Sequence, residues 1–212
     1  MLGYGPRVGL YTNQILPRIL DCGMGLSYIG EERQKCLSNV SGQVLEIGFG
    51  SGHNLPYYSS RVERLVAIDP SRVSAKLARK RVVVAPFPVE YLPLKGEEIP
   101  AADQSFDSVV STFTLCTIPD VAIALWQIRR VLKPTGHFFF LEHGLSPDPA
   151  VQRWQDRMNG VQKALFGGCH LNRDMEQLII SAGFEILALD KYYSKGPKAA
   201  AHFYRGLARP LR

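Results

Sequence analysis

The fold of this chain is decided by one stretch, Val44-Leu45-Glu46-Ile47-Gly48-Phe49-Gly50-Ser51-Gly52-His53-Asn54. Its beginning, residues 44–47, is mostly apolar, which favours a buried parallel strand. Three glycines follow at alternate positions, and glycine in a tight turn lets a ligand approach the bare backbone. The chain then becomes compatible with a helix, whose first amides would point into the same space. A glycine turn that merely connects a strand to a helix has the same pattern, so later elements must decide.

The next strand candidate ends at an acidic residue whose spacing from the glycines along the sequence is typical of a nucleotide site. Residues 65–68 are apolar and end at Asp69, about 20 positions after Gly48, where Rossmann-like sites hold a ribose diol. A carboxylate suits a diol because it accepts two hydroxyl protons. The alternative for Asp69 is an N-cap of the following helix. The dinucleotide pattern G-x-G-x-x-G does not fit, since it needs glycine where the chain has His53.

The order Glu46-x-Gly48-x-Gly50-x-Gly52 resembles the first motif of class I S-adenosylmethionine-dependent methyltransferases. Two later segments extend the resemblance over about residues 40–145. Residues 96–107, Gly-Glu-Glu-Ile-Pro-Ala-Ala-Asp-Gln-Ser-Phe-Asp, look like the family's acidic segment. Residues 128–136, Ile-Arg-Arg-Val-Leu-Lys-Pro-Thr-Gly, are close to its "E-x-x-R-V-L-K-P-G-G". Lys95 stands where an adenine-contacting acid is often found, which leaves only the backbone contact near Gly96 expected.

The resemblance implies an enzyme that transfers a methyl group from S-adenosyl-L-methionine. The residues that it implies for cofactor binding are Glu46, Gly48, Gly50, Gly52, Asn54, Asp69, Pro70, Gly96, Glu97 and Thr112.

Strand and helix candidates alternate from residue 44 to residue 141, which predicts a mostly parallel sheet covered on both faces. Strands are expected at 44–48, 65–68, 89–92, 106–111 and 137–142, and helices at about 52–59, 71–84, 97–100 and 120–132. Residues 184–189 and 201–207 are expected to form an antiparallel strand pair. The predicted fold class is α/β: a Rossmann-like, doubly wound, seven-stranded sheet with an N-terminal helical arm. Residues 1–41 would be that arm or lid, and residues 42–212 the methyltransferase domain.

Helices are also expected outside the alternating region. In the arm they lie at 11–21 and about 29–39, where Tyr4, Tyr11 and Met24 are either acceptor-pocket or packing residues. Asp148 followed by Pro149 predicts the start of a later helix. Its apolar face would be Val151, Trp154, Met158, Val161 and Leu165.

Composition and charge narrow the class of protein. The 212 residues include 46% hydrophobic ones and carry a net charge of +6. This is ordinary globular composition, and no apolar run approaches a membrane span. Four separated cysteines form no CxxC pair, which favours reduced thiols and a cytoplasmic location. A basic helix face at positions 72, 76, 79 and 80 is either solvated or attracted to anionic lipid or nucleic acid, so peripheral membrane contact stays open. The oligomeric state is not predicted.

The acceptor end should follow the fourth and fifth strands, because sites in open α/β sheets lie beyond the carboxyl ends of the strands. Methyl transfer from a sulfonium needs a general base only when the acceptor must lose a proton. His143 is the candidate base, because its ordinary pKa lies near neutrality; the alternative is a histidine bonded to loop backbone. Arg173 is the second candidate catalytic residue, placed to favour an anionic acceptor. No metal is expected, since the Cys and His spacing matches no zinc finger or ribbon.

Four segments together resemble small methyltransferase-like proteins that S-methylate alkyl thiols and hydrogen sulfide: Leu115-Cys116-Thr117, Leu141-Glu142-His143, the helix of Trp154 and Cys169-x-Leu171-x-Arg173. The resemblance favours a small thiol or sulfide as acceptor. The animal members carry an N-terminal membrane anchor, which is not expected here. Phospholipid N-methylation is one alternative, and a non-catalytic cofactor-binding module is another. No nucleic-acid partner is expected, because residues 111–116 lack the acidic or Asn residue with Pro-Pro and an aromatic that base-modifying enzymes carry.

Overall fold

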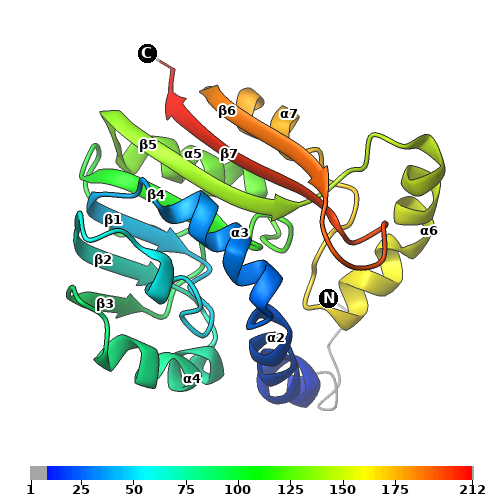
Figure 1. The fold of residues 1–212 in the computed structure, drawn as a ribbon, viewed down its shortest axis with the longest axis horizontal. Helices are drawn as coiled ribbons and strands as arrows, with labels where there is room; N and C mark the ends of the chain where they lie inside the picture. Colours follow the sequence, from blue (N-terminus) through cyan, green and yellow to red (C-terminus); the bar gives the residue numbers. More distant parts are fainter. Residues whose placement is uncertain (1–8, 212) are drawn as a thin grey trace.

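The computed structural model describes residues 9–211, which form a seven-stranded sheet (Figure 1). The strands are β1 (Gly42–Ile47), β2 (Val62–Ile68), β3 (Val89–Leu92), β4 (Phe106–Thr112), β5 (Leu132–His143), β6 (Phe184–Tyr193) and β7 (His202–Pro210). Their order in the sheet is β3-β2-β1-β4-β5-β7-β6. The first five are parallel neighbours, and β7 pairs antiparallel with both β5 and β6. The predicted α/β, Rossmann-like sheet with its antiparallel C-terminal pair is confirmed.

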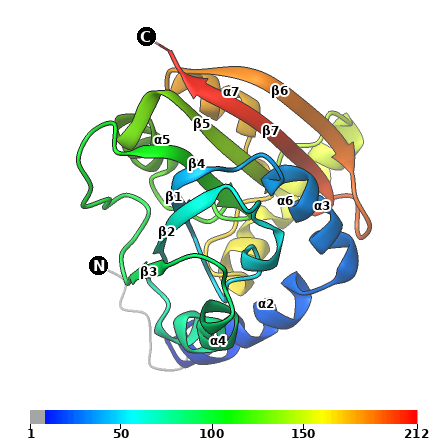
Figure 2. The same cartoon turned by 60° about the vertical axis from the view of Figure 1, so that its left-hand side comes forward.

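Helices cover both faces of this sheet. They are α2 (Leu16–Met24), α3 (Ser27–Leu37), α4 (Arg72–Val83), α5 (Val121–Val131), α6 (Pro149–Leu165) and α7 (Met175–Ser181), and a π-helical turn, η1 (Tyr11–Ile15), precedes α2. Side chains of α3 and α4 join one buried apolar cluster, and those of α5 and α7 join the other. Figure 2 shows α2 beside α4 at the lower edge of the molecule, where the arm leaves the sheet. The arm therefore crosses the end of the sheet at which the parallel strands stop.

The starts of four helices are encoded locally. In each, a short polar side chain accepts a hydrogen bond from a backbone amide two or three residues later, which satisfies a donor that has no partner inside the helix. The capping residues are Ser71, Asp120, Asp148 and Asp174. The expected start of α6 at Asp148-Pro149 is thus confirmed. The cap of α4 is Ser71, so Asp69 is free of the capping role that was its alternative.

Two expected helices are absent. Residues 52–59 hold only a short 3-10 turn, η2 (Leu55–Tyr57), because Leu55 and Tyr58 are drawn into the core and β2 begins soon after. Residues 97–100 form a turn and extended chain. Here Pro100 disfavours helical geometry at Ile99, which is buried against the sheet. The predicted helix start directly after the glycines is therefore wrong, and the chain on this side of the cavity is a loop.

The apolar stripe of α6 is only partly buried. Val151 packs inside, whereas Trp154 is 59% exposed and Met158, Val161 and Leu165 are also exposed. Among residues 9–211 there is no helix whose length and apolar character would suffice to cross a bilayer.

Candidate active site at the carboxyl ends of the strands

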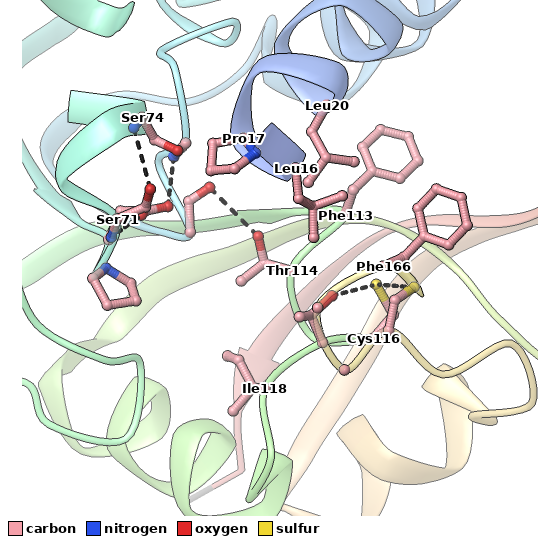
Figure 3. Close-up of a pocket in the computed structure, with 18 of the residues that line it drawn as sticks. Leu16, Pro17, Leu20, Ser71, Ser74, Phe113, Thr114, Cys116, Ile118 and Phe166 are labelled. Carbon is pink, nitrogen blue, oxygen red and sulfur yellow. Dashed lines mark hydrogen bonds between the residues drawn. The ribbon is translucent and has the colours of Figure 1, made fainter. Parts of the chain in front are cut away.

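A cavity of about 1250 Å³ opens where β1, β2, β4 and β5 end. Binding sites of small ligands are typically about 300–1,000 Å³, so this one has room for a large cofactor and a second small molecule. Figure 3 shows Ser71 at one end and Cys116 with Phe166 at the other. Leu16, Pro17 and Leu20 of α2 lie above the space between them. The arm therefore forms the roof of the cavity.

The glycine turn after β1 forms part of the cavity wall. Gly48 has a φ of +73°, and a Cβ there would stand 2.0 Å from Thr114 Oγ1. Only glycine accommodates both the left-handed backbone and this neighbour. Gly96 is equally confined, because a Cβ would stand 2.8 Å from Ile47 Cγ2. Both residues line the cavity with backbone, as expected for positions that a ligand approaches closely.

Asp69 stands directly after β2 and is buried, with 9% of its surface exposed. One carboxylate oxygen accepts from the Gly50 amide at 2.8 Å and the other from the Ser71 amide at 2.7 Å. Burial raises the pKa of Asp69 above its ordinary value, although these two bonds oppose the shift. A carboxylate oxygen can accept more than one hydrogen bond, so the group can still receive a diol. Pro70 lines the cavity beside it.

A buried polar network lies beneath the glycine turn. Glu46 accepts from Asn54 Nδ2 at 2.8 Å and from the Tyr58 hydroxyl at 2.6 Å. Burial raises the pKa of Glu46 to about 7, against the effect of these bonds and of the Arg33 charge. Glu46 and Asn54 are not among the residues that line the cavity, and Gly52 is not either. Their position is that of a support for the cavity wall.

Arg33 links this network to the cavity. It comes from α3, is only 4% exposed, and lines the cavity. Its Nη1 donates to Thr112 Oγ1 at 2.8 Å and to Asn54 Oδ1. Its Nε is buried and has no hydrogen-bond partner among residues 9–211. Since an unpaired buried donor is costly, Arg33 is suited to receive an anionic group of a ligand. Nothing in the sequence marks Arg33 as a binding residue, because an arginine in a helix with many polar residues is usually exposed to solvent.

The two residues expected near adenine lie at the far wall. Gly96 and Glu97 both line the cavity, together with Lys95. Thr112, at the end of β4, lines it too and accepts the Arg33 bond described above.

At the other end, three side chains from separate elements meet. Cys116 follows β4, His143 ends β5, and Cys169 follows α6; all three line the cavity. His143 Nε2 lies 2.9 Å from Cys169 Sγ, which lies 3.7 Å from Cys116 Sγ. Burial disfavours the charged imidazole, but the contact with Cys169 and the Glu142 charge outweigh it and raise the pKa of His143. The predicted base is thus at the cavity, with one ring nitrogen already in contact with a thiol.

Glu142 fixes the loop that carries Cys116. Its carboxylate is fully buried and accepts from the amides of Thr114 and Leu115 at 2.9–3.0 Å and from the Ser111 hydroxyl at 2.8 Å. Because these bonds use most of its acceptor sites, Glu142 acts as a positioning residue for the loop. The sequence analysis quoted Glu142 only as a neighbour of His143, since its partners lie more than 25 positions away.

Arg173 lines the cavity, as predicted, but its guanidinium is held by backbone. Nη1 donates to the carbonyls of Ile118, at 2.8 Å, and Leu115. Burial lowers the pKa of Arg173. The side chain therefore ties the segment before α7 to the loop after β4 and brings a positive charge to this end of the cavity.

The arm is tied down at its edge. Asp21 of α2 lies 3.1 Å from Arg81 Nη1 and 2.9 Å from His53 Nε2. Met24 lines the cavity, whereas the Tyr11 hydroxyl donates to the Leu165 carbonyl on α6. Tyr4 lies outside the described residues.

Comparison with known proteins shows which families this chain is similar to. Residues 45–140 match the model of the family described as a methyltransferase domain. The thiol S-methyltransferase TMT1B of Rattus norvegicus is 32% identical over 166 residues, covering 74% of this chain and 66% of that protein. This chain thus spans just under two thirds of the length of that relative.

Solved structures show the same fold at low identity. An S-adenosylmethionine-dependent methyltransferase of Leishmania major superposes with a TM-score of 0.70 at 13% identity, covering 96% of this chain and 82% of that one. The [4+2]-cyclase SpnF superposes with a TM-score of 0.66 at 18% identity, covering 87% and 80%. Because one fold occurs in both a methyltransferase and a cyclase, the type of reaction must be argued from the site.

Proposed function

The chain belongs to the S-adenosylmethionine-dependent methyltransferases, and from that premise we propose that it transfers the methyl group to the sulfur of a small thiol or sulfide. Methyl transfer from the sulfonium is an in-line displacement. The protein's part is to orient the acceptor and exclude water. The glycine turn, Asp69 and the segment at Gly96 provide the place for the cofactor, and Cys116 with His143 marks the acceptor end.

The positive charge at the acceptor end is the observation that favours sulfur as the methyl acceptor. The acidic residues that line the cavity are Asp21, Asp69 and Glu97, on the arm and along the cofactor wall. The acceptor end instead has Arg173 and Lys163 in its lining. A positive environment favours a thiolate and opposes an ammonium group, which would need a carboxylate or an aromatic cage. The relatives named as thiol S-methyltransferases support the same choice.

Apolar side chains complete the acceptor end. Leu16, Leu20, Phe113 and Phe166 line the cavity near Cys116 (Figure 3). They exclude water from the sulfur, and His143 promotes loss of the thiol proton. The arm, residues 1–41, acts as the lid over the domain formed by residues 42–212.

An acceptor panel tests the proposal. The enzyme is incubated with methyl-labelled cofactor and small thiols, amines or phenols, each with and without anionic vesicles. We expect thiols to be methylated without vesicles. Turnover of a phospholipid amine that requires vesicles and falls with salt would contradict the sulfur proposal, because exposed charges are screened over about 10 Å at 0.1 M salt. Absence of turnover with every acceptor, at high enzyme concentration, would favour a cofactor-binding module.

We further propose that Arg33 binds the carboxylate of the cofactor's methionine part. Replacement by methionine should weaken binding of S-adenosylhomocysteine roughly 10- to 100-fold, since a charged hydrogen bond contributes about 1.5–3 kcal/mol. Calorimetry with decarboxylated S-adenosylmethionine provides the control. It lacks the carboxylate, so its affinity should change little in Arg33→Met. Equal losses for both ligands would show that Arg33 only supports the fold.

A further inference from the structure

The sulfur-lined end of the cavity has the composition of a metal site. Cys116, His143 and Cys169 each offer one ligand atom, and these atoms all lie within 4.8 Å of one another. Thiolate and imidazole are ligands that soft or borderline cations prefer, and tetrahedral sites of sulfur and nitrogen are typical of zinc. The sequence argument against a metal considered spacing along the chain. The three residues come together only because β4, β5 and the end of α6 converge.

The distances fit tetrahedral coordination better than a disulfide. Two thiolates bound to zinc at about 2.3 Å are separated by about 3.8 Å in a tetrahedral site. The two Sγ atoms of Cys116 and Cys169 are 3.7 Å apart. A disulfide would require them to approach to about 2.05 Å. In such a site the imidazole nitrogen and a thiolate are about 3.6 Å apart. His143 Nε2 is 2.9 Å from Cys169 Sγ, so the imidazole would need to withdraw by about 0.7 Å to share a metal.

The protein alone leaves the imidazole under-satisfied. His143 is 9% exposed, and its Nδ1 is buried with no hydrogen-bond partner among residues 9–211. Its other nitrogen faces only a thiol, which is a weak hydrogen-bonding group. A zinc ion at Nε2 would replace this weak partner with a strong one, whereas Nδ1 would stay without a protein partner.

The supports of the three ligands are rigid. Glu142 holds the loop of Cys116 through the backbone bonds described above. The His170 amide donates to the Cys116 carbonyl at 2.8 Å, which fixes the Cys169 segment against that loop. His143 belongs to a strand paired on both sides. Ligands held in this way are pre-organised for a metal ion.

We propose that Cys116, His143 and Cys169 bind a zinc ion whose fourth coordination position opens into the acceptor end of the cavity. Two thiolates and a neutral imidazole balance the charge of Zn²⁺, so the buried site needs no further counter-ion. Three protein ligands with one open position are the arrangement of catalytic rather than structural zinc.

The role of this zinc rests on the proposed sulfur acceptor. A thiol that enters the open position binds as thiolate and releases its proton to solvent, because zinc deprotonates a coordinating thiol. In this arrangement His143 promotes loss of the proton through the metal that it holds, and it does not accept the proton itself. The sulfur then forms a bond to the methyl carbon as the bond from that carbon to the cofactor sulfonium breaks. The products are a methyl thioether and S-adenosylhomocysteine. The neutral thioether is a weak ligand and leaves.

Metal analysis tests the site without using activity. The chain is expressed in zinc-supplemented medium and purified without chelator, and its metal content is measured by mass spectrometry. We expect roughly one zinc per chain, and below about a tenth of that in Cys116→Ser and Cys169→Ser. Cys22→Ser is the matched control, because Cys22 is exposed on α2 and is not among the cavity residues. Binding of S-adenosylhomocysteine by each variant verifies that it is folded.

Cobalt provides a second readout. Reconstitution of the metal-free protein with Co²⁺ should give the thiolate charge-transfer band and the intense visible bands of tetrahedral cobalt, both lost in Cys169→Ser. A folded wild-type protein without zinc and without these bands would overturn the inference. So would a disulfide between Cys116 and Cys169 in the protein as isolated, or zinc retained at the wild-type level in Cys116→Ser and Cys169→Ser.

Failure of this inference can be distinguished from failure of the proposed function. If chelator-treated, metal-free protein methylates thiols at the full rate, the role of zinc in the reaction fails and the sulfur acceptor stands. If zinc is bound but an amine or phenol is turned over instead of thiols, the site stands and the sulfur acceptor fails. Loss of thiol methylation on metal removal, restored by zinc, supports both.

Discussion

Replacement of His143 by alanine is expected to slow thiol methylation at pH 7 about a hundredfold, the lower end of what a group that assists proton loss contributes. His143 lines the acceptor end and contacts Cys169. Without it the enzyme must wait for thiolate already present in solution. A thiol with pKa near 8.5 is about 3% thiolate at pH 7 and about 75% at pH 9, so the thiolate fraction rises about 25-fold. The rate of His143→Ala should therefore rise about 25-fold at pH 9, to roughly a quarter of the wild-type rate at pH 7.

The measurement is the rate of product formation at saturating cofactor across this pH range. His137→Ala is the matched control, since His137 stands in the middle of β5, is not among the residues that line the cavity, and should keep the wild-type profile. A wild-type rate for His143→Ala at pH 7 would remove His143 from the mechanism. An equal loss at both pH values would indicate a packing role only.

The fold was predictable because its signals are local. The apolar run of 44–47 and the N-cap Asp148 depend on neighbouring residues, and both elements form where expected. The expected helix at 52–59 failed because tertiary packing of Leu55 and Tyr58 overrides local preference. The expected helix at 97–100 failed for a reason that is visible in the sequence, because the proline at position 100 disfavours helical geometry at the residue before it.

The residues of the site were predictable only where they belong to a motif whose members are close together in the sequence. The glycines at 48 and 50, Asp69 and Gly96 line the cavity as expected. Glu46 belongs to the same motif but lies beneath the cavity wall, where its carboxylate accepts hydrogen bonds from Tyr58 and Asn54. Arg33 reaches the cavity from an arm helix 79 positions away from Thr112, a contact that no spacing rule anticipates.

The residues at the acceptor end were even harder to predict, because they are far apart in the sequence. Cys116 and Cys169 are 53 positions apart, so their sequence spacing indicates two unrelated thiols. Parallel β4 and β5 end at one edge of the sheet, and α6 returns the chain to that edge (Figure 1). Proximity of the sulfurs is thus a property of the topology.

The last prediction concerns Asp69. Replacement by alanine should weaken binding of S-adenosylhomocysteine by at least about a hundredfold. Two hydrogen bonds from ribose hydroxyls to a charged acceptor contribute about 1.5 kcal/mol each at the lower end, or about 3 kcal/mol together. The structure adds a complication, because the carboxylate also receives the amides of Gly50 and Ser71. Removal of the carboxylate therefore also removes two bonds that hold the glycine turn.

A double cycle separates these effects. Calorimetry compares wild type and Asp69→Ala, each with S-adenosylhomocysteine and with its 2′,3′-dideoxy analogue. If Asp69 binds the ribose, removing the hydroxyls weakens wild-type binding as much as the mutation does, and the two losses together are no larger than either alone. Additive losses would assign Asp69 to the turn and leave the ribose without its predicted partner. Because the defect lies in cofactor binding, the methylation rate of Asp69→Ala at limiting cofactor should show no recovery at pH 9, in contrast to His143→Ala.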